Sequence, residues 1–269
     1  MRRELVFTVF AALFLSSCDN YHYKEAEQLR ANGLGLAAAE EYKYFVEKSP
    51  TDARAPLALF KAAGIYSREF GVCSKSGPLL EKLLRNYPTT TLRQAAMRAL
   101  FICPDYFPID AAGIWVYGDS QTGGKNASQK LFITGVSPDK TLAENSIYAG
   151  RQLVRLQKRV YTISGSDLIE KQDGANTILL RYPLNTGSSW TSNGQGGSSI
   201  FKVEAAGLMV KTRAGGFDNC VKISRRIPGM SSWMYEYYAP WKGKILTSVA
   251  GNGFENRVME LISYEEKTK

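Results

Sequence analysis

The chain has 269 residues, of which 44% are hydrophobic and 22% are charged, and its formal net charge is +9. This composition is typical of a folded globular protein and excludes a mainly disordered chain. The positive charge suits either nucleic acid or an anionic lipid surface as a partner. The first residues of the chain distinguish between these two.

The N-terminal segment has the parts of a bacterial export signal. Arg2 and Arg3 supply a positive start, an apolar run occupies residues 5–15, and two serines precede Cys18. The apolar run is too short to cross a bilayer as a helix. The segment resembles the bacterial lipoprotein signal, which implies that residues 1–17 are a signal peptide and that Cys18 is lipidated after cleavage.

Lipidation of Cys18 predicts an envelope protein that faces the periplasm and has the membrane as a partner. Several acyl chains on one residue make a stable anchor. Export also excludes nucleic acid as a partner. An ordinary secretory signal with a chance cysteine is the alternative. Asp19 retains lipoproteins of enteric bacteria in the inner membrane, but that rule does not transfer reliably, and the choice between inner and outer membrane stays open.

Residues 18–104 are predicted to form a helical domain. Apolar residues recur at helical spacing in two segments that end at Pro50 and Pro88, which are 38 residues apart. A repeated helix pair of this size resembles the tetratricopeptide repeat, whose usual period is about 34 residues. The resemblance implies a concave face that binds an envelope protein partner.

The cysteines leave two alternatives open. An exported protein can form disulfides, and Cys73 and Cys103 flank the same predicted helical region. A bridge between these two is one expectation, and two separate buried thiols are the other. In the first case Cys220 is left as a small apolar residue in a predicted strand.

Residues 105–269 have a different sequence pattern from the helical region. Short segments of alternating apolar and polar residues follow one another, with Gly, Asn or Pro between them. Such a series predicts an antiparallel sheet, either curled or bent into a half-barrel. The predicted fold is therefore an α+β multidomain chain, in which a helical-repeat (TPR-like) domain precedes an antiparallel β domain.

Two similar phrases occur in this second region: YFPIDAAGIW at residues 106–115 and YPLNTGSSW at residues 182–190. In each, a proline precedes a tryptophan by seven positions. Proline cannot donate to a central ladder, so each phrase is expected to begin or border a strand. Duplication of a half-sheet is one explanation for the similarity.

These phrases, together with AGGFDNCVKI at residues 214–223 and YYAPWKGKI at residues 237–245, resemble a family of uncharacterised domains in bacterial exported proteins and lipoproteins. The resemblance covers most of residues 105–269. Gly216 and Trp241 depart from the pattern, where Thr and Gly are usual. The family offers no catalytic residues, so the resemblance implies a fold and a location but no activity.

Neither a catalytic site nor a metal or cofactor site is expected. His22 is the single histidine of the chain, which disfavours a nucleophile–histidine pair. The cysteines are too scattered for a zinc cluster. A glycan-active enzyme would need two carboxylates across a cleft. The candidates for that least favoured function are Asp105, Asp110, Glu255, Glu260 and Glu265.

Aromatic residues alternate along one predicted strand. Trp233, Tyr235 and Tyr237 share one face of it and are the candidate ligand-facing aromatics for a lipid or another apolar molecule.

A second strand pairs apolar with basic residues. Val154, Leu156 and Val160 fall on one face, while Arg155, Gln157 and Arg159 fall on the other. The basic residues Arg151, Arg155 and Arg159 suit anionic lipid headgroups or an acidic partner, although the favoured interpretation is the solvated face of an antiparallel sheet.

The sequence therefore predicts a non-catalytic envelope lipoprotein that acts as a protein-binding scaffold or adaptor. A lipid or apolar-ligand carrier is the alternative function, and a glycan-active enzyme is the least favoured.

Overall fold

A computed structural model describes residues 21–101, 103–107, 112–137, 140–194 and 196–266. The predicted signal peptide and the lipidation of Cys18 lie outside these residues. The chain divides into two compact units, Met1–Pro104 and Asp105–Lys269, and each is described by itself.

The first unit is built from short helices. A helical segment at residues 21–31 precedes them. The labelled elements are α2 (Gly35–Lys48), α3 (Ala55–Gly64), the π-helical turn η1 (Ile65–Glu69), α4 (Cys73–Asn86) and α5 (Arg93–Phe101). Each packs on the next, around a core that includes Tyr42, Phe45 and Leu59. None of the described helices is long and apolar enough to cross a membrane.

The prediction of a TPR-like helical-repeat domain is wrong. One twelve-stranded antiparallel sheet dominates the fold, and α2 to α5 are only 9 to 14 residues long. The two helix pairs also differ in their covalent links. A disulfide joins Cys73 to Cys103, whereas the residues one predicted period of 38 positions earlier, Gly35 and Ile65, cannot form a disulfide. The spacing of the prolines reflects where α2 and α4 end, since proline cannot continue a helix.

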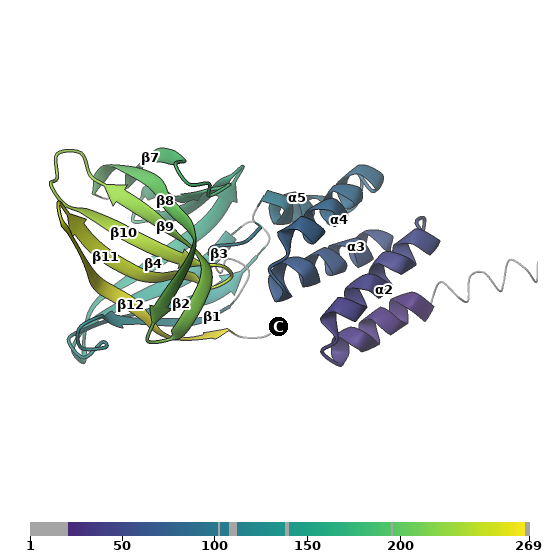
Figure 1. Ribbon diagram of the computed structural model, residues 1–269, viewed down its shortest axis with the longest axis horizontal. Helices are drawn as coiled ribbons and strands as arrows, with labels where there is room; N and C mark the ends of the chain where they lie inside the picture. Colours follow the sequence, from purple (N-terminus) through teal and green to yellow (C-terminus); the bar gives the residue numbers. More distant parts are fainter. Residues whose placement is uncertain (1–20, 102, 108–111, 138–139, 195, 267–269) are drawn as a thin grey trace, which may run out of the picture. The chain divides into compact units, whose positions relative to one another are not determined.

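The second unit is a single sheet, shown in Figure 1. Its strands are β1 (Gly113–Asp119), β2 (Ala127–Val136), β3 (Lys140–Ala149), β4 (Gln152–Ser164), β5 (Asp167–Gln172), β6 (Ala175–Arg181), β7 (Ser189–Gly194), β8 (Gly197–Thr212), β9 (Gly215–Arg226), β10 (Trp233–Ala239), β11 (Gly243–Gly251) and β12 (Phe254–Glu266). The spatial order is β6-β5-β4-β3-β2-β1-β12-β11-β10-β9-β8-β7. Two six-stranded meanders, β1–β6 and β7–β12, are therefore joined through the antiparallel pair of β1 and β12.

The sheet curls into a nearly closed barrel (Figure 1), which corrects the prediction of a half-barrel. Its edge strands β6 and β7 share no ladder among the described pairings, and side chains bridge them instead. The N–H of Ile178 donates to Ser192 Oγ at 2.7 Å, and Trp190 Nε1 donates to the carbonyl of Ile178 at 3.0 Å. Bulges in long strands, as between Val203 and Ala205 in β8, increase the curvature.

Candidate functional site

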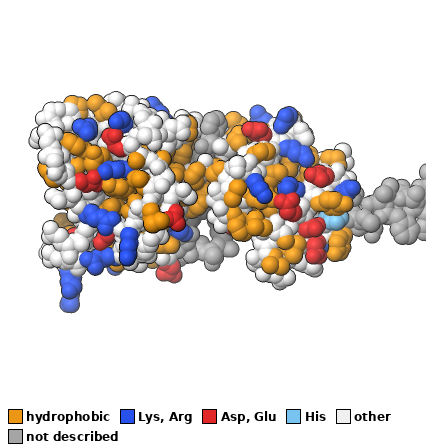
Figure 2. Space-filling view, in the orientation of Figure 1, with side chains coloured by type: hydrophobic (Ala, Val, Ile, Leu, Met, Phe, Trp, Pro, Cys, Tyr) orange, Lys and Arg blue, Asp and Glu red, His pale blue; other side chains and the backbone are white. Residues whose placement is uncertain are grey.

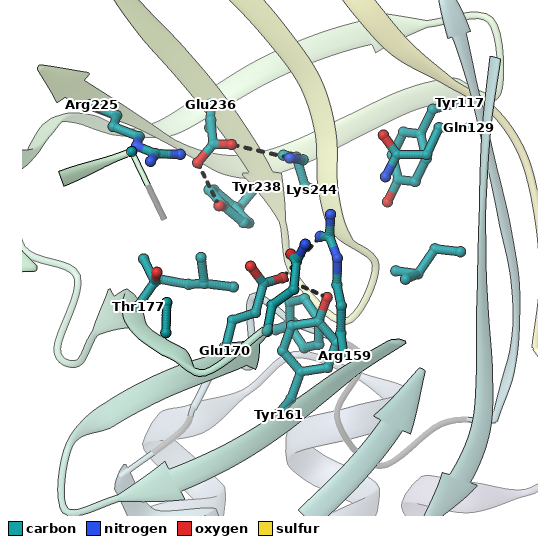
Figure 3. A pocket seen from close by; sticks show the side chains of 16 residues that line it. Tyr117, Gln129, Arg159, Tyr161, Glu170, Thr177, Arg225, Glu236, Tyr238 and Lys244 are labelled. Atoms are coloured by element: carbon teal, nitrogen blue, oxygen red, sulfur yellow. Dashed lines mark hydrogen bonds and ion pairs between the residues drawn. The ribbon is translucent and has the colours of Figure 1, made fainter. Parts of the chain in front are cut away.

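A cavity of about 250 Å³ lies in the second unit, and Figure 3 shows the side chains that line it. Most of the lining residues come from β1, β2, β4, β5, β6, β9, β10 and β11, strands that encircle the barrel, and Phe107 and Gly196 come from connecting segments. Successive side chains of a strand point to opposite faces. Arg159 and Tyr161 on β4, and Glu236 and Tyr238 on β10, are each two residues apart and so share the inner face.

The first polar group of the cavity joins β4 to β5. Arg159 Nη1 lies 2.9 Å from Glu170 Oε2, and the hydroxyl of Tyr161 donates to the same oxygen at 2.9 Å. Arg159 Nη2 donates to Gln157 Oε1 at 2.9 Å, and Asn145 Nδ2 donates to that oxygen at 3.0 Å. Burial raises the pKa of Tyr161 far above its usual value, so this hydroxyl stays protonated at neutral pH.

The second polar group joins β10 to β11. Lys244 Nζ lies 3.0 Å from Glu236 Oε1, and the hydroxyl of Tyr238 donates to Glu236 Oε2 at 2.9 Å. Burial by itself would raise the pKa of the Glu236 carboxyl. The charge and hydrogen bond of Lys244, with the hydrogen bond from Tyr238, outweigh burial and hold that pKa below its usual value. Glu236 is therefore ionised at neutral pH.

The lining chemistry matches a polar occupant. Two ion pairs and the tyrosine hydroxyls that donate to them face into the cavity (Figure 3). An apolar molecule would cover these groups without replacing their hydration, which is unfavourable. Among the described residues, no group of three or more His, Cys, Asp or Glu side chains is arranged to hold a metal ion.

The candidate aromatics of β10 do not line this cavity. Trp233, Tyr235 and Tyr237 alternate with Glu236 and Tyr238, so they project from the opposite face of the strand. The guanidinium of Arg226 lies 3.9 Å from the ring centre of Trp233. Lys222 Nζ lies 3.8 Å from the ring centre of Tyr235, and the hydroxyl of Tyr237 donates to Glu255 at 2.5 Å. Basic side chains therefore cover Trp233 and Tyr235, whereas Tyr237 and Glu255 line a second, open pocket on the outer face.

The candidate carboxylates are also elsewhere. Asp105 is buried against Tyr182, Glu255 pairs with Lys222, and Glu260 pairs with Arg213. Glu265 is exposed, and Asp110 lies outside the described residues.

The cysteine pair belongs to the first unit. The Cα atoms of Cys73 and Cys103 are 5.6 Å apart across their disulfide. Cys220 is a free thiol, fully buried in β9. Burial raises the pKa of this thiol to about 11, which suits an unreactive packing residue.

The net positive charge does not form one basic patch on the surface that Figure 2 shows. There, Lys and Arg side chains of the second unit are interspersed with acidic and hydrophobic ones. Arg155 lies 3.7 Å from Asp173, while Arg159 lies inside the barrel. The basic residues of β4 are thus divided between the surface and the cavity.

Sequence reasoning missed the cavity residues Arg159, Glu170, Glu236, Tyr238 and Lys244. One signal for them exists, since RVY at residues 159–161 and EYY at residues 236–238 each place a charge and a tyrosine two positions apart. Such a spacing puts both side chains on one face of a strand.

No protein-family model matches the chain, and neither does any curated protein. Comparison with solved structures finds partial likenesses. A candidate exported protein with a YmcC-like fold from Bacteroides fragilis is 13% identical, with a TM-score of 0.43, over 61% of this chain and 100% of that one. A candidate lipoprotein from Parabacteroides distasonis is 14% identical, with a TM-score of 0.41, over 60% of this chain and 98% of that one. At such low identities and TM-scores, these likenesses carry no conclusion about function.

Proposed function

We propose that the second unit is a non-catalytic binding module that holds one small polar ligand inside its barrel, in a protein anchored to the cell envelope through Cys18. The charged lining of the cavity carries this proposal. Small barrels either fill their interior with side chains or hold one small ligand. Here the interior keeps a cavity of about 250 Å³ and two ion pairs around it.

The energetics of the lining support a binding role. Buried ion pairs contribute little to stability compared with apolar packing, because both charges lose hydration. Arg159, Glu170 and Glu236 would therefore be poor choices for a cavity whose only role is to stabilise the barrel. Each is held by a neighbouring strand, which orients its polar atoms before a ligand arrives.

The same geometry disfavours the other functions. A scaffold role rested on a helical repeat that the fold does not contain. A lipid carrier needs an apolar interior, whereas the candidate aromatics of β10 face outward. A glycosidase needs one of its two carboxyl groups to be protonated, whereas both cavity carboxylates, Glu170 and Glu236, are ion-paired with a basic side chain.

A binding screen with a cavity-filling variant tests the proposal. The purified protein is mixed with sugars, amino acids, hydroxy acids and fatty acids, and binding is measured by thermal shift and native mass spectrometry. Ala175 lines the cavity, and the next residue, Asn176, is exposed. Ala175→Phe should abolish binding of a polar compound, and Asn176→Phe should preserve it. Binding of fatty acids alone, or no binding by any compound, would overturn the proposal.

A further inference from the structure

One basic side chain of the described cavity lining makes no close ion pair. The described lining residues include three basic side chains and two carboxylates. Glu170 pairs with Arg159 and Glu236 pairs with Lys244, which leaves Arg225. Its Nε donates to Ser199 Oγ at 3.4 Å, and no carboxylate of the described chain lies within ion-pair distance of its guanidinium. The described lining therefore carries a net charge of +1, although the charge of Arg225 also acts on the carboxylate of Glu236.

Two polar side chains on another wall are also without partners. Tyr117 on β1 and Gln129 on β2 are direct cross-strand neighbours, and both line the cavity. Tyr117 is only 6% exposed. Neither side chain makes a hydrogen bond to any residue that the structure describes. Burial raises the pKa of Tyr117 well above its usual value, so the hydroxyl remains a donor at neutral pH.

Arg225 lies on a different side of the cavity from Tyr117 and Gln129. In Figure 3, Tyr117 and Gln129 appear together on one side and Arg225 on the other. The sheet order agrees, because β12, β11 and β10 separate β1 from β9. None of the three has a fully buried polar atom that lacks a partner, so their free polar atoms face the open space of the cavity. A bound molecule that spans the cavity would therefore contact all three.

The chemistry of these groups defines that molecule. An arginine fork binds a carboxylate through two parallel hydrogen bonds. Tyrosine hydroxyls and carboxamides bind hydroxyl groups. A net charge of +1 matches one negative charge better than two. The volume, about 250 Å³, lies just below the usual range of drug-sized sites, which begins at about 300 Å³, and so it suits a molecule of monosaccharide size.

We infer that the ligand is a small hydroxylated monoanion of the sugar-acid class, with its carboxylate on Arg225 and its hydroxyl groups on Tyr117 and Gln129. This inference rests on the proposed function and names the ligand class of the same cavity.

Calorimetry with matched ligands tests the inference. The acids are glucuronate, galacturonate and gluconate, and the neutral counterparts are glucose and galactose. At least one acid should bind about tenfold or more tightly than its neutral counterpart. Arg225→Gln should remove that difference, because the guanidinium recognises the carboxylate. Arg226→Gln is the matched control, since Arg226 lies on the outer face over Trp233, and it should leave every affinity unchanged.

A second variant covers the case in which Arg225→Gln does not fold. Tyr117→Phe should weaken the acid and its neutral counterpart to the same extent, because the hydroxyl contacts a group that both share. Equal affinities for acids and neutral sugars would overturn the inference and leave the proposed function standing. If none of the three acids bound while a neutral or cationic compound from the screen did, the inference would again be overturned and the proposed function would stand. Absence of binding by every polar compound would overturn both.

Discussion

The backbone N–H of Tyr106 donates a hydrogen bond to the hydroxyl oxygen of Tyr182, which lies 76 residues further along the chain, at 3.0 Å. The same hydroxyl donates to Asp105 Oδ1 at 3.3 Å, and Asp105 also accepts from the N–H of Phe107 at 2.8 Å. Tyr106 and Tyr182 belong to the two similar phrases of the second unit. The contact therefore ties the start of the barrel to the junction between its two meanders.

Tyr182→Phe removes a buried acceptor from the N–H of Tyr106. A buried donor left without a partner costs about 1–3 kcal/mol, so the free energy of unfolding should fall by about this amount in urea titrations. Tyr264→Phe is the matched control, because Tyr264 is 37% exposed and its hydroxyl makes no hydrogen bond within the described residues. Equal losses in the two variants would contradict the role of this contact.

The two phrases show what the sequence could predict about the sheet. Each was expected to begin a strand, and Trp115 lies in β1 while Trp190 lies in β7, the first strands of the two meanders. Both tryptophans are buried. Their corresponding positions are consistent with duplication of a half-sheet. Pro108 lies outside the described residues, so only the second proline, Pro183, is placed.

The direction of the strand faces could not be predicted in the same way. Alternation along β4 assigned Val154 and Leu156 to the core and Arg159 to solvent. In the structure Val154 and Leu156 are 62% and 54% exposed, and Arg159 lies in the cavity. Val154, Leu156 and Arg159 are thus exchanged relative to the prediction, whereas Arg155 stays at the surface as expected. The rule that apolar side chains face inward fails at this place because Arg159 faces the polar cavity, although apolar side chains such as Trp115 and Leu261 fill other parts of the interior.

The same exchange explains the error at β10. The face with Trp233, Tyr235 and Tyr237 is the more apolar, so a sequence pattern assigns it to the interior. Glu236 becomes acceptable inside only because β11 places Lys244 beside it, 3.0 Å away. A pairing between strands is not visible in the sequence of either strand. The helical repeat was wrong for a related reason, since local periodicity predicts helices but not how they stack.

The disulfide is expected to stabilise the first unit. Cys73 and Cys103 are 30 residues apart in sequence, and closing a loop of this length stabilises a fold by about 3–4 kcal/mol in the chain-entropy treatment. A Cys73→Ser, Cys103→Ser variant should lose helical circular dichroism at a lower temperature than the parent protein. Cys220→Ala, in the second unit, should leave that helical transition in place. A helical transition that is the same with and without the disulfide would contradict this expectation.

Acid should destabilise the barrel through Glu236. Its pKa in the fold lies below the usual value of 4.5, so the stabilisation is fully present above about that pH and is lost as pH falls through the folded-state pKa. Glu236→Gln leaves Lys244 without its anion and should cost about 1–3 kcal/mol at pH 7. Between pH 6 and pH 3, urea titrations should show a smaller loss of stability in this variant than in the parent.

Glu265→Gln serves as the control for the acid experiment. Glu265 is exposed on β12 and pairs with no basic residue of the described chain. Its variant should follow the acid dependence of the parent. If Glu236→Gln also followed the parent curve, the carboxylate of Glu236 would not contribute to acid sensitivity.

Cys18→Ser should release the protein from membranes. The serine hydroxyl cannot carry the thioether-linked lipid, and a short apolar signal does not replace several acyl chains as an anchor. Fractionation of cells followed by immunodetection should move the variant from the membrane to the soluble fraction. Cys220→Ala is again the control and should remain with the membrane. A membrane-bound Cys18→Ser protein would refute lipidation as the main attachment.

The seam between β6 and β7 should be the least protected part of the barrel wall, because side chains replace a backbone ladder there. Ser192→Ala removes the acceptor, 2.7 Å away, of the Ile178 N–H. A loss of about 1–3 kcal/mol at this bond corresponds to hydrogen exchange at Ile178 that is about 5-fold to 150-fold faster. Asn145, in the laddered strand β3, should keep its exchange rate. Ser198→Ala, which changes an exposed serine in β8, should alter neither rate. Equal acceleration at both amides would mean that Ser192 supports the whole barrel and not the seam alone.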